Sequence, residues 1–506
     1  MAPHGPFVEE GEPVSTTFFD RTHESIHRVN VSNESAADDV DLLVIGGGIT
    51  GCAVARDAAA RGLTVILVEK NDLSSGTSGR STKLLHGGLR YLEHGHFGLV
   101  REALREREVT ARLAPALARP LRFVMPVRPG VFPGRLSARL GVGLYDLIAG
   151  SHPLERGRSV SAVEIASLAP SLGPGWVGGV AFADRQTDDG RLTVAIARDA
   201  RRRGASIRLG MTVTALTPGA PGYRASLRDD DGRETVVCAR CVVNAAGPWS
   251  DRVRRLAGKS RPILRASRGA HLVLSGVPLK AALLLPGAAR AHRLFAIPWR
   301  DATLFGTTDI VDAGNPGRDL PEIEDLRLLF QEARRLFPAA GLTRHHVLSA
   351  FTGVRPLLRQ DGTTLASSRE HRVLDEDGLV TIAGGKLTTW RTMGLATVDA
   401  VVSRLGRGGA SPASLIEEPL PGGRDEHPEL GTILAEEMVK HADDVVFRRL
   451  PIGHDPREAR RALPSIIERM ADRFLWGPER REAEASRVIE RLDAGAARLD
   501  EALGTA

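Results

Sequence analysis

Six residues near the start of the chain have the spacing of a phosphate-binding loop. They are Gly46, Gly47, Gly48, Ile49, Thr50 and Gly51, which match the pattern G-x-G-x-x-G. The apolar residues 40–45 before them predict a strand, and the residues after them predict a helix that ends at Gly62. Glycines allow a tight turn and close approach of a pyrophosphate, and the helix N-terminus faces the phosphates with partial positive charge. The pattern therefore predicts a dinucleotide-binding site.

The residues after this loop narrow the choice of dinucleotide. Glu69 ends the next predicted strand, where its carboxylate can accept hydrogen bonds from ribose hydroxyls. A glutamate at this place, instead of a basic residue, argues against a ligand with a 2′-phosphate. The following loop, residues 74–82, is small and polar except for Arg80. Its backbone amides and hydroxyls can approach a flat, polar ring system, and this second cradle favours FAD over free NAD.

The surrounding pattern predicts the alternating strands and helices of an α/β protein. A strand, glycine turn, helix and second strand occupy residues 40–70. Other predicted elements are an exposed amphipathic helix over 97–113, a helix and strand over about 191–217, a strand over 241–247, a helix near 322–337, and a strand, glycine turn and helix over 382–402. From about residue 425 the sequence is helical and charged, which predicts a C-terminal helical appendage.

The composition excludes several classes of protein. Of the 506 residues, 42% are hydrophobic and 26% are charged, which is typical of a globular chain and excludes a largely disordered or fibrous one. Aromatic residues make up only 4%, which argues against a platform that stacks nucleic-acid bases. The net charge of +6 is spread without a long basic block, yet it favours contact with anionic lipid heads or a phosphorylated substrate.

The cysteines predict packing roles. An odd count of three gives no disulfide framework and fits a reducing compartment. The pair Cys238 and Cys241 has the spacing C-x-x-C, but in a strand these two positions face opposite sides, and no second pair completes a zinc site. We expect both to belong to the core, with Cys52 packed inside the first helix, and we expect no metal site.

Five segments occur in an order that identifies a family. They are SGTSGRSTKLLHGGLRYLE, VVNAAGPWSD, IPWRDATLFGTTD, FTGVRPLL and IAGGKLTTWR. Together they resemble the FAD-dependent glycerol-3-phosphate dehydrogenases of the D-amino-acid-oxidase-like flavoproteins. The resemblance covers about residues 40–400, and EEMVKHADDVVFRR extends it more loosely into the C-terminal part. An extension of 38 residues before the first strand departs from the family pattern.

The resemblance implies an α/β fold with interleaved domains. A Rossmann-like FAD-binding domain is expected over about 39–95, 180–261 and 345–405, with a mixed-sheet substrate domain over about 96–179 and 262–344. Together these form an oxidoreductase region over 39–405. A flexible tail is expected over 1–38, and a linker and helical domain over 406–506.

The implied reaction is the oxidation of sn-glycerol 3-phosphate to dihydroxyacetone phosphate, with hydride transfer to noncovalent FAD and reoxidation by a membrane quinone. Such a reaction needs cations for a phosphate dianion and a base for the C2 hydroxyl. Arg90, Arg355 and Lys386 lie in three of the matched segments and are the candidate cations. His86 is the candidate base because imidazole titrates near ~6.5 and Gly87 and Gly88 leave room beside it. His271 is the second candidate.

Further residues receive roles from the same match. Those expected to bind substrate are Tyr91, His271, Thr308 and Asp309. Those expected to bind FAD, besides the loop and Glu69, are Ser81, Thr82, Lys83, Leu84, Val213, Ala246, Gly247, Gly384, Gly385, Leu387 and Thr388. Asp188 and Asp189 are expected to cap the following helix.

The partners and rival functions follow from the same reading. A quinone acceptor and the absence of an apolar run long enough to span a bilayer predict a cytoplasmic protein held peripherally on the inner face of the cytoplasmic membrane. We expect no signal peptide and no nucleic-acid partner, and a homodimer is a further expectation. Three rivals stay open: an oxidase that uses oxygen on the same substrate, an amino-acid-oxidising flavoenzyme, and a flavin-binding protein without catalysis.

Overall fold

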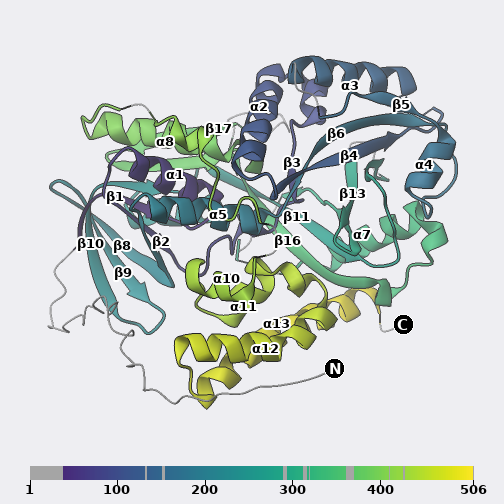
Figure 1. The fold of residues 1–506 in the computed structure, drawn as a ribbon. Helices are drawn as coiled ribbons and strands as arrows, with labels where there is room; N and C mark the ends of the chain where they lie inside the picture. Colours follow the sequence, from purple (N-terminus) through teal and green to yellow (C-terminus); the bar gives the residue numbers. More distant parts are fainter. Residues whose placement is uncertain are drawn as a thin grey trace, which may run out of the picture. The chain divides into compact units, whose positions relative to one another are not determined.

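The computed structural model describes residues 38–130, 134–150, 154–288, 293–311, 316–317, 320–359, 370–409, 411–425 and 428–504, apart from the side chains of Arg90, Glu93 and His94. A tail was predicted over residues 1–38, and residues 1–37 of it lie outside the described part of the chain. Residues 37–506 form one unit, in which two sheets carry helices on their faces (Figure 1).

The first sheet carries the predicted dinucleotide loop. Its strands lie in the order β17, β18, β10, β1, β2, β7, and the hairpin β8–β9 continues from β10. Their bounds are β1 Asp38–Ile45, β2 Val65–Glu69, β7 Ser206–Leu209, β8 Met211–Gly219, β9 Gly222–Asp229, β10 Glu234–Asn244, β17 His371–Glu376 and β18 Leu379–Gly384. β1 pairs in parallel with β2 and with β10. The apolar runs of β1 and β2 are buried, as expected for parallel strands with both faces covered.

Helices α1 (Ile49–Ala60), α5 (Asp189–Arg202) and α8 (Trp390–Arg404) pack together beside this sheet (Figure 1). Small residues make the packing close: a Cβ added to Gly394 of α8 would lie 2.9 Å from the Ala53 Cβ of α1. The hairpin β8–β9 and α6 (Ser250–Leu256) contribute to a second apolar cluster on the sheet.

The second sheet has ten strands in the described part of the chain. Their order is β15, β11, β14, β13, β12, β4, β6, β3, with β16 on β11 and β5 on β6. Their bounds are β3 Leu84–Leu85, β4 Ala118–Pro126, β5 Arg158–Val160, β6 Gly179–Thr187, β11 Leu264–Leu274, β12 Ala282–Pro286, β13 Arg293–Trp299, β14 Ala302–Gly306, β15 Ile310–Val311 and β16 Val347–Leu358. The α/β fold with a mixed second sheet is thus as predicted.

Two strands pair outside the first sheet although their residues fall largely in ranges predicted for the FAD-binding domain. β6 pairs with β4, and β16 pairs with β11, so both belong to the second sheet. An apolar pattern indicates that a strand is buried, but it does not indicate which sheet the strand joins. The limits of the two domains stay a prediction.

Helices of the second sheet include α2 (Phe97–Leu113), α3 (Arg135–Ala149), α4 (Ala162–Leu168) and α7 (Ile323–Leu336). The helices predicted over 97–113 and near 322–337 are confirmed as α2 and α7. The prediction that α2 is exposed is wrong in part. Its Glu106 and Arg107 are buried because they form ion pairs with Arg391 and Asp184 at 2.5 Å and 2.6 Å.

The C-terminal part is helical, as predicted, with a small apolar core of its own. Its elements are α9 Ser414–Glu417, α10 Leu430–Glu436, α11 Ala442–Asp444, the π turn η7 Val445–Arg449, α12 Pro456–Phe474 and α13 Pro478–Leu503. Elsewhere the chain forms the short turns η1 Thr77–Gly79, η2 Leu89–His94, η3 Gly247–Trp249, η4 Pro338–Ala340, η5 Arg344–His346, η6 Leu387–Thr389 and η8 Pro451–His454. Leu499 and Ala502 of α13 join the core of the second sheet, where α7 packs.

Candidate active site

A cavity of about 860 Å³ brings the predicted motifs together. Its wall includes the loop after β1, residues 75–82, the segment after β10, strands β11 and β16, and the segment after β18. Residues of the C-terminal helices complete it. This volume lies in the range of about 300–1,000 Å³ typical of sites for small molecules and cofactors.

The glycine loop has the geometry that the motif predicts. Gly46 has φ +115°, and a Cβ there would lie 2.6 Å from the Ala245 carbonyl oxygen. A Cβ on Gly51 would lie 1.9 Å from the Gly46 carbonyl oxygen, so helix α1 can begin this close only with glycine. Gly46, Gly48, Ile49 and Thr50 line the cavity, whereas Gly51 serves the packing behind it.

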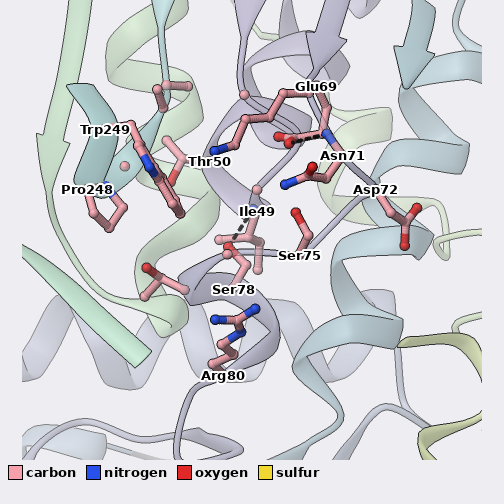
Figure 2. A pocket seen from close by; sticks show the side chains of 18 of the residues that line it. Ile49, Thr50, Glu69, Asn71, Asp72, Ser75, Ser78, Arg80, Pro248 and Trp249 are labelled. Atoms are coloured by element: carbon pink, nitrogen blue, oxygen red, sulfur yellow. Dashed lines mark hydrogen bonds between the residues drawn. The ribbon is translucent and has the colours of Figure 1, made fainter. Parts of the chain in front are cut away.

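Glu69 lies at the edge of the same loop. Its Oε2 accepts a hydrogen bond from the Gly47 amide at 2.7 Å. Its Oε1 accepts one from the Asn71 amide at 3.0 Å (Figure 2). Burial raises the pKa of this carboxyl, against the effect of the two amides. The carboxylate faces the cavity beside the glycines, which is the position expected for a group that contacts a ribose.

The loop of residues 74–82 forms a second wall, as the sequence predicts. Ser78 Oγ accepts a hydrogen bond from the Ile49 amide at 2.9 Å, which ties this loop to the start of α1 (Figure 2). Trp249 closes the wall, since a Cβ on Gly76 would lie 3.1 Å from its ring. Lys70 Nζ lies 4.4 Å from the centre of the same ring.

Lys83 does not belong to the cavity wall, contrary to the expectation that it binds the cofactor. It is buried, and its ammonium group forms an ion pair with Asp189 and donates to the Gly79 carbonyl at 3.0 Å. Asp189 also accepts from the Ser81 amide at 2.9 Å, so this pair holds the second loop from behind. Asp188 caps α5 by accepting from the Arg191 amide at 3.0 Å, as predicted.

Arg355 lines the cavity from β16. Its guanidinium donates to Thr307 Oγ1 at 3.1 Å and to the Thr308 carbonyl at 3.2 Å, and it pairs with Asp309 at 3.2 Å. Thr308 itself is buried, and its hydroxyl accepts from the Ala270 amide at 2.9 Å. Thr308 and Asp309, predicted as substrate residues, thus lie behind Arg355 and not on the cavity wall.

Lys386 lines the cavity from the segment after β18. Gly384 and Gly385 precede it, both with φ +79°, and both line the cavity. A Cβ on Gly385 would lie 2.3 Å from Met393 Sδ, so the turn requires glycine. The Lys386 ammonium lies 3.8 Å from the centre of the Tyr91 ring, and Tyr91 contacts the site through this lysine.

His86 lies on the cavity wall directly after β3. Its amide donates to Thr388 Oγ1 at 3.1 Å, which joins its loop to the segment of Lys386. The Gly87 amide donates to the Tyr145 hydroxyl at 2.8 Å and fixes the loop from the side of α3. Arg90 lies four residues later in η2, and its side chain is outside the described part of the structure.

His271 faces the cavity from β11 and is only 2% exposed. Its Nε2 lies 3.0 Å from Thr82 Oγ1, and its ring stacks on Phe351 with centroids 4.9 Å apart. Burial, with smaller contributions from the charges of Arg355 and Lys83, lowers the pKa of His271 to about 3. The imidazole is therefore neutral at neutral pH.

The other residues predicted to bind FAD lie on the cavity wall. Ser81, Thr82, Leu84, Val213, Ala246, Gly247, Leu387 and Thr388 line the cavity. Sequence reasoning missed several wall residues near the glycine loop: Asn71, Met211, Thr212, Pro248, Trp249 and Arg252. For Pro248 and Trp249 a signal was present, because they follow Gly247 in a segment that already carried the family match.

Sequence reasoning also missed the wall formed by the C-terminal helices. Asp72, beside the second loop, accepts from Arg448 at 2.5 Å and from Arg449 at 2.7 Å, and all three groups are buried. Burial opposes the charge of Asp72, but the two arginines outweigh it and hold its pKa below the usual value. Arg449 also donates to the Glu437 carbonyl at 3.0 Å. We call this cluster, Asp72 with Arg448, Arg449 and Glu437, the C-terminal clamp.

Other chemical signals in the sequence lie away from the site. Cys52 and Cys241 are buried and Cys238 is half-buried, and burial raises the pKa of Cys241 to about 12. Among the described residues, no group of histidines, cysteines and carboxylates could hold a metal ion.

The residues around the cavity fit FAD. The loop after β1 leaves backbone free of side chains at Gly46 and Gly48, the N-terminus of α1 faces the cavity, and a carboxylate stands at the ribose position. The same wall includes two adjacent glycines with positive φ, Gly384 and Gly385, together with two histidines and two cations.

Comparison with known proteins agrees with this fit. The model of the family "FAD dependent oxidoreductase" matches residues 41–399. The chain is 37% identical over 420 residues to the mitochondrial glycerol-3-phosphate dehydrogenase of Mus musculus, and it spans 56% of that protein's length. It is 36% identical over 405 residues to the glycerol-3-phosphate dehydrogenase of Synechocystis sp., with 76% of this chain and 73% of the relative covered.

A solved structure is similar over nearly the whole chain. The glycerol-3-phosphate dehydrogenase from Bacillus halodurans, complexed with FAD, superposes with a TM-score of 0.74 at 26% identity. The match covers 90% of this chain and 95% of that one, so it includes the C-terminal helices as well as both sheets.

Proposed function

The chain belongs to the family of FAD-dependent glycerol-3-phosphate dehydrogenases, and from this we propose that it oxidises sn-glycerol 3-phosphate to dihydroxyacetone phosphate. Its cofactor is FAD. The observation that best supports the proposed substrate is the presence of two cations and two histidines on the wall of the cavity that contains the glycine loop. Arg355, Lys386, His86 and His271 come from four separate segments of the chain and line this single cavity.

Arg355 and Lys386 are the proposed phosphate ligands. Arginine presents a planar fork of donors that matches two phosphate oxygens, and lysine adds a point charge. Thr307, the Thr308 carbonyl and Asp309 hold the guanidinium in place, so its orientation is set before substrate arrives. An amino acid would offer a single carboxylate with one negative charge, whereas a phosphate dianion can use both cations on the cavity wall.

His86 is the proposed base for the C2 hydroxyl. When bound, FAD supplies the acceptor for the two electrons and the hydrogen that leave C2. The proton of the hydroxyl must leave as the carbonyl forms, and the imidazole of His86 on the cavity wall is the group proposed to take it. His271 is a weaker base because of its lowered pKa, and its neutral ring is better suited to orient the substrate by hydrogen bonding.

We further propose that a membrane quinone reoxidises the flavin and that the protein binds the inner face of the cytoplasmic membrane peripherally. Family resemblance supports this proposal. No helix among the described residues is long and apolar enough to cross a bilayer. A homodimer stays a prediction.

Anaerobic reduction of the flavin tests the proposed substrate. Glycerol 3-phosphate should bleach the absorbance of the oxidised flavin, whereas glycerol and amino acids at the same concentration should leave it nearly unchanged. Steady-state turnover with a soluble quinone and then with oxygen as sole acceptor separates the dehydrogenase from the oxidase. Bleaching by an amino acid in place of glycerol 3-phosphate would overturn the proposal.

A further inference from the structure

One helix carries an unusual concentration of exposed leucine. In α3, Leu136, Leu140, Leu144 and Leu147 are 74%, 65%, 36% and 76% exposed. They are four of the eleven large apolar side chains that are exposed among the described residues. At 100° per residue, their spacing places all four within an arc of about 80° on the helix surface. We call this arc the leucine stripe.

The leucine stripe faces away from the protein. Ala138, Val142 and Tyr145 lie on the opposite side of α3 and are buried in the core of the second sheet. The Tyr145 hydroxyl contacts Asp184 at 2.8 Å and accepts from the Gly87 amide. These buried contacts fix the rotation of α3, so its leucines are held outward by the packing of its other face.

Of the three charged residues of α3, the two that are exposed are arginines. Arg135 and Arg139 are exposed on α3. The helix has one acidic residue, Asp146, whose carboxylate accepts a hydrogen bond from the Gly157 amide at 2.7 Å. An apolar stripe flanked by arginine is the pattern of a helix that lies in the interface of an anionic bilayer.

We propose that α3 is the helix by which this protein docks on a lipid surface, with the leucines among the upper acyl chains and Arg135 and Arg139 at anionic head groups. This inference rests on the proposed peripheral membrane association and names the face that carries it. On the inner side of α3, the Tyr145 hydroxyl accepts a hydrogen bond from Gly87, next to His86. The docking face on the outer side of the helix is therefore about 10 Å, the diameter of a helix, from the loop that borders the cavity. This side of the protein would then face an acceptor dissolved in lipid.

Vesicle sedimentation of the FAD-loaded protein tests the docking face. Wild type should sediment with vesicles of phosphatidylcholine and phosphatidylglycerol. Leu140→Gln together with Leu147→Gln should lower the partition coefficient on the order of 100-fold, because two leucines no longer leave water. Arg135→Gln with Arg139→Gln should lower it about 30-fold on these vesicles and much less on pure phosphatidylcholine.

The matched control removes two exposed leucines from other elements. Leu328→Gln with Leu475→Gln should sediment like wild type, since these residues lie on α7 and after α12. Flavin absorbance and melting temperature report whether each variant is folded. Size-exclusion chromatography of the same variants reports whether the leucine stripe joins two copies.

Three results would overturn the inference. If the variant Leu140→Gln with Leu147→Gln sediments like wild type, another face docks, and the proposed membrane association still stands. If wild type ignores both vesicle types, the membrane association fails with the inference. If wild type ignores vesicles and the leucine variant turns a dimer into a monomer, the leucine stripe is an interface between copies. Flavin bleaching by glycerol 3-phosphate is measured without lipid and is independent of all three results.

Discussion

Replacing Arg355 by alanine is the sharpest test of the phosphate site. The guanidinium stands on the cavity wall with fixed neighbours: Thr307 Oγ1 at 3.1 Å, the Thr308 carbonyl at 3.2 Å and Asp309 at 3.2 Å. The alanine variant loses the phosphate contact and leaves the carboxylate of Asp309 near the place of the phosphate. Both effects weaken binding of a dianion, whereas binding of uncharged glycerol loses neither.

The magnitude follows from the partners of this arginine. A charge-assisted hydrogen bond contributes about 1.5–3 kcal/mol, and a two-pronged contact lies toward the upper end. The ion pair with Asp309 offsets part of the charge, but it is worth at most about 1 kcal/mol because Asp309 is 46% exposed. We therefore expect kcat/KM for glycerol 3-phosphate to fall roughly 30- to 1000-fold, which corresponds to a loss of about 2–4 kcal/mol in transition-state stabilisation.

The assay compares two substrates in three proteins. Anaerobic stopped-flow reduction of the flavin by glycerol 3-phosphate and by glycerol gives the preference for the phosphate. Arg355→Ala should lose most of this preference, and Arg355→Lys should keep part of it because the charge remains without the fork. Arg265→Ala is the matched control, since it removes an exposed arginine from β11 that does not line the cavity. If Arg355→Ala prefers glycerol 3-phosphate as strongly as wild type, the phosphate is bound elsewhere and the proposed substrate loses its main support.

Three further predictions concern the base, the buried histidine and the glycine loop. His86→Ala should leave substrate affinity nearly unchanged and slow flavin reduction by ~10²–10⁴, with loss of the pH dependence near neutrality; reduction at the wild-type rate in stopped-flow experiments would show that the base lies elsewhere. His271 has a pKa of about 3 in the folded protein and near ~6.5 in the unfolded chain. Between these pH values, unfolding therefore takes up a proton. The contribution of the neutral ring to the free energy of unfolding is complete above pH ~6.5 and decreases as the pH falls. Urea unfolding should therefore show that wild type loses up to about 2 kcal/mol more than His271→Gln between pH 7 and pH 5, and equal losses would contradict the buried neutral ring. Gly51→Ala places a Cβ 1.9 Å from the Gly46 carbonyl oxygen and should lower FAD retention on gel filtration and stability by about 1–3 kcal/mol, whereas the control Gly495→Ala, which meets no atom within 4 Å, should retain FAD.

Parts of the site could be predicted from the sequence where they depend on residues close to one another in the chain. The turn at Gly46, the start of α1 at Gly48 and the carboxylate of Glu69 depend on spacing within one strand–helix–strand unit, and the structure has all three in the expected places. The second loop was predicted for the same reason. Its small polar residues could approach a ligand, and they line the cavity beside the glycines.

The parts that the sequence did not reveal depend on partners far away in the chain. Lys83 is next to predicted cofactor residues, yet it is buried in an ion pair with Asp189, which lies 106 positions later in the chain. The assignment of β6 and β16 depended in the same way on strands that no local pattern identifies. The pKa of His271 follows from the burial that its strand and neighbours impose, and its sequence neighbours carry no sign of it.

The C-terminal clamp has a consequence for how the protein is made in the cell. Asp72 leaves the ribosome early, but its partners Arg448 and Arg449 are among the last 60 or so residues, which at about 5–20 residues per second emerge many seconds later. Until then, Asp72 is a carboxylate without its two cations beside an incomplete cavity wall. Synthesis of the glycine loop therefore precedes closure of the site, and FAD can enter the open cavity during translation and become enclosed when the last helices dock. A nascent chain released before residue 448 would lack the wall that retains the cofactor.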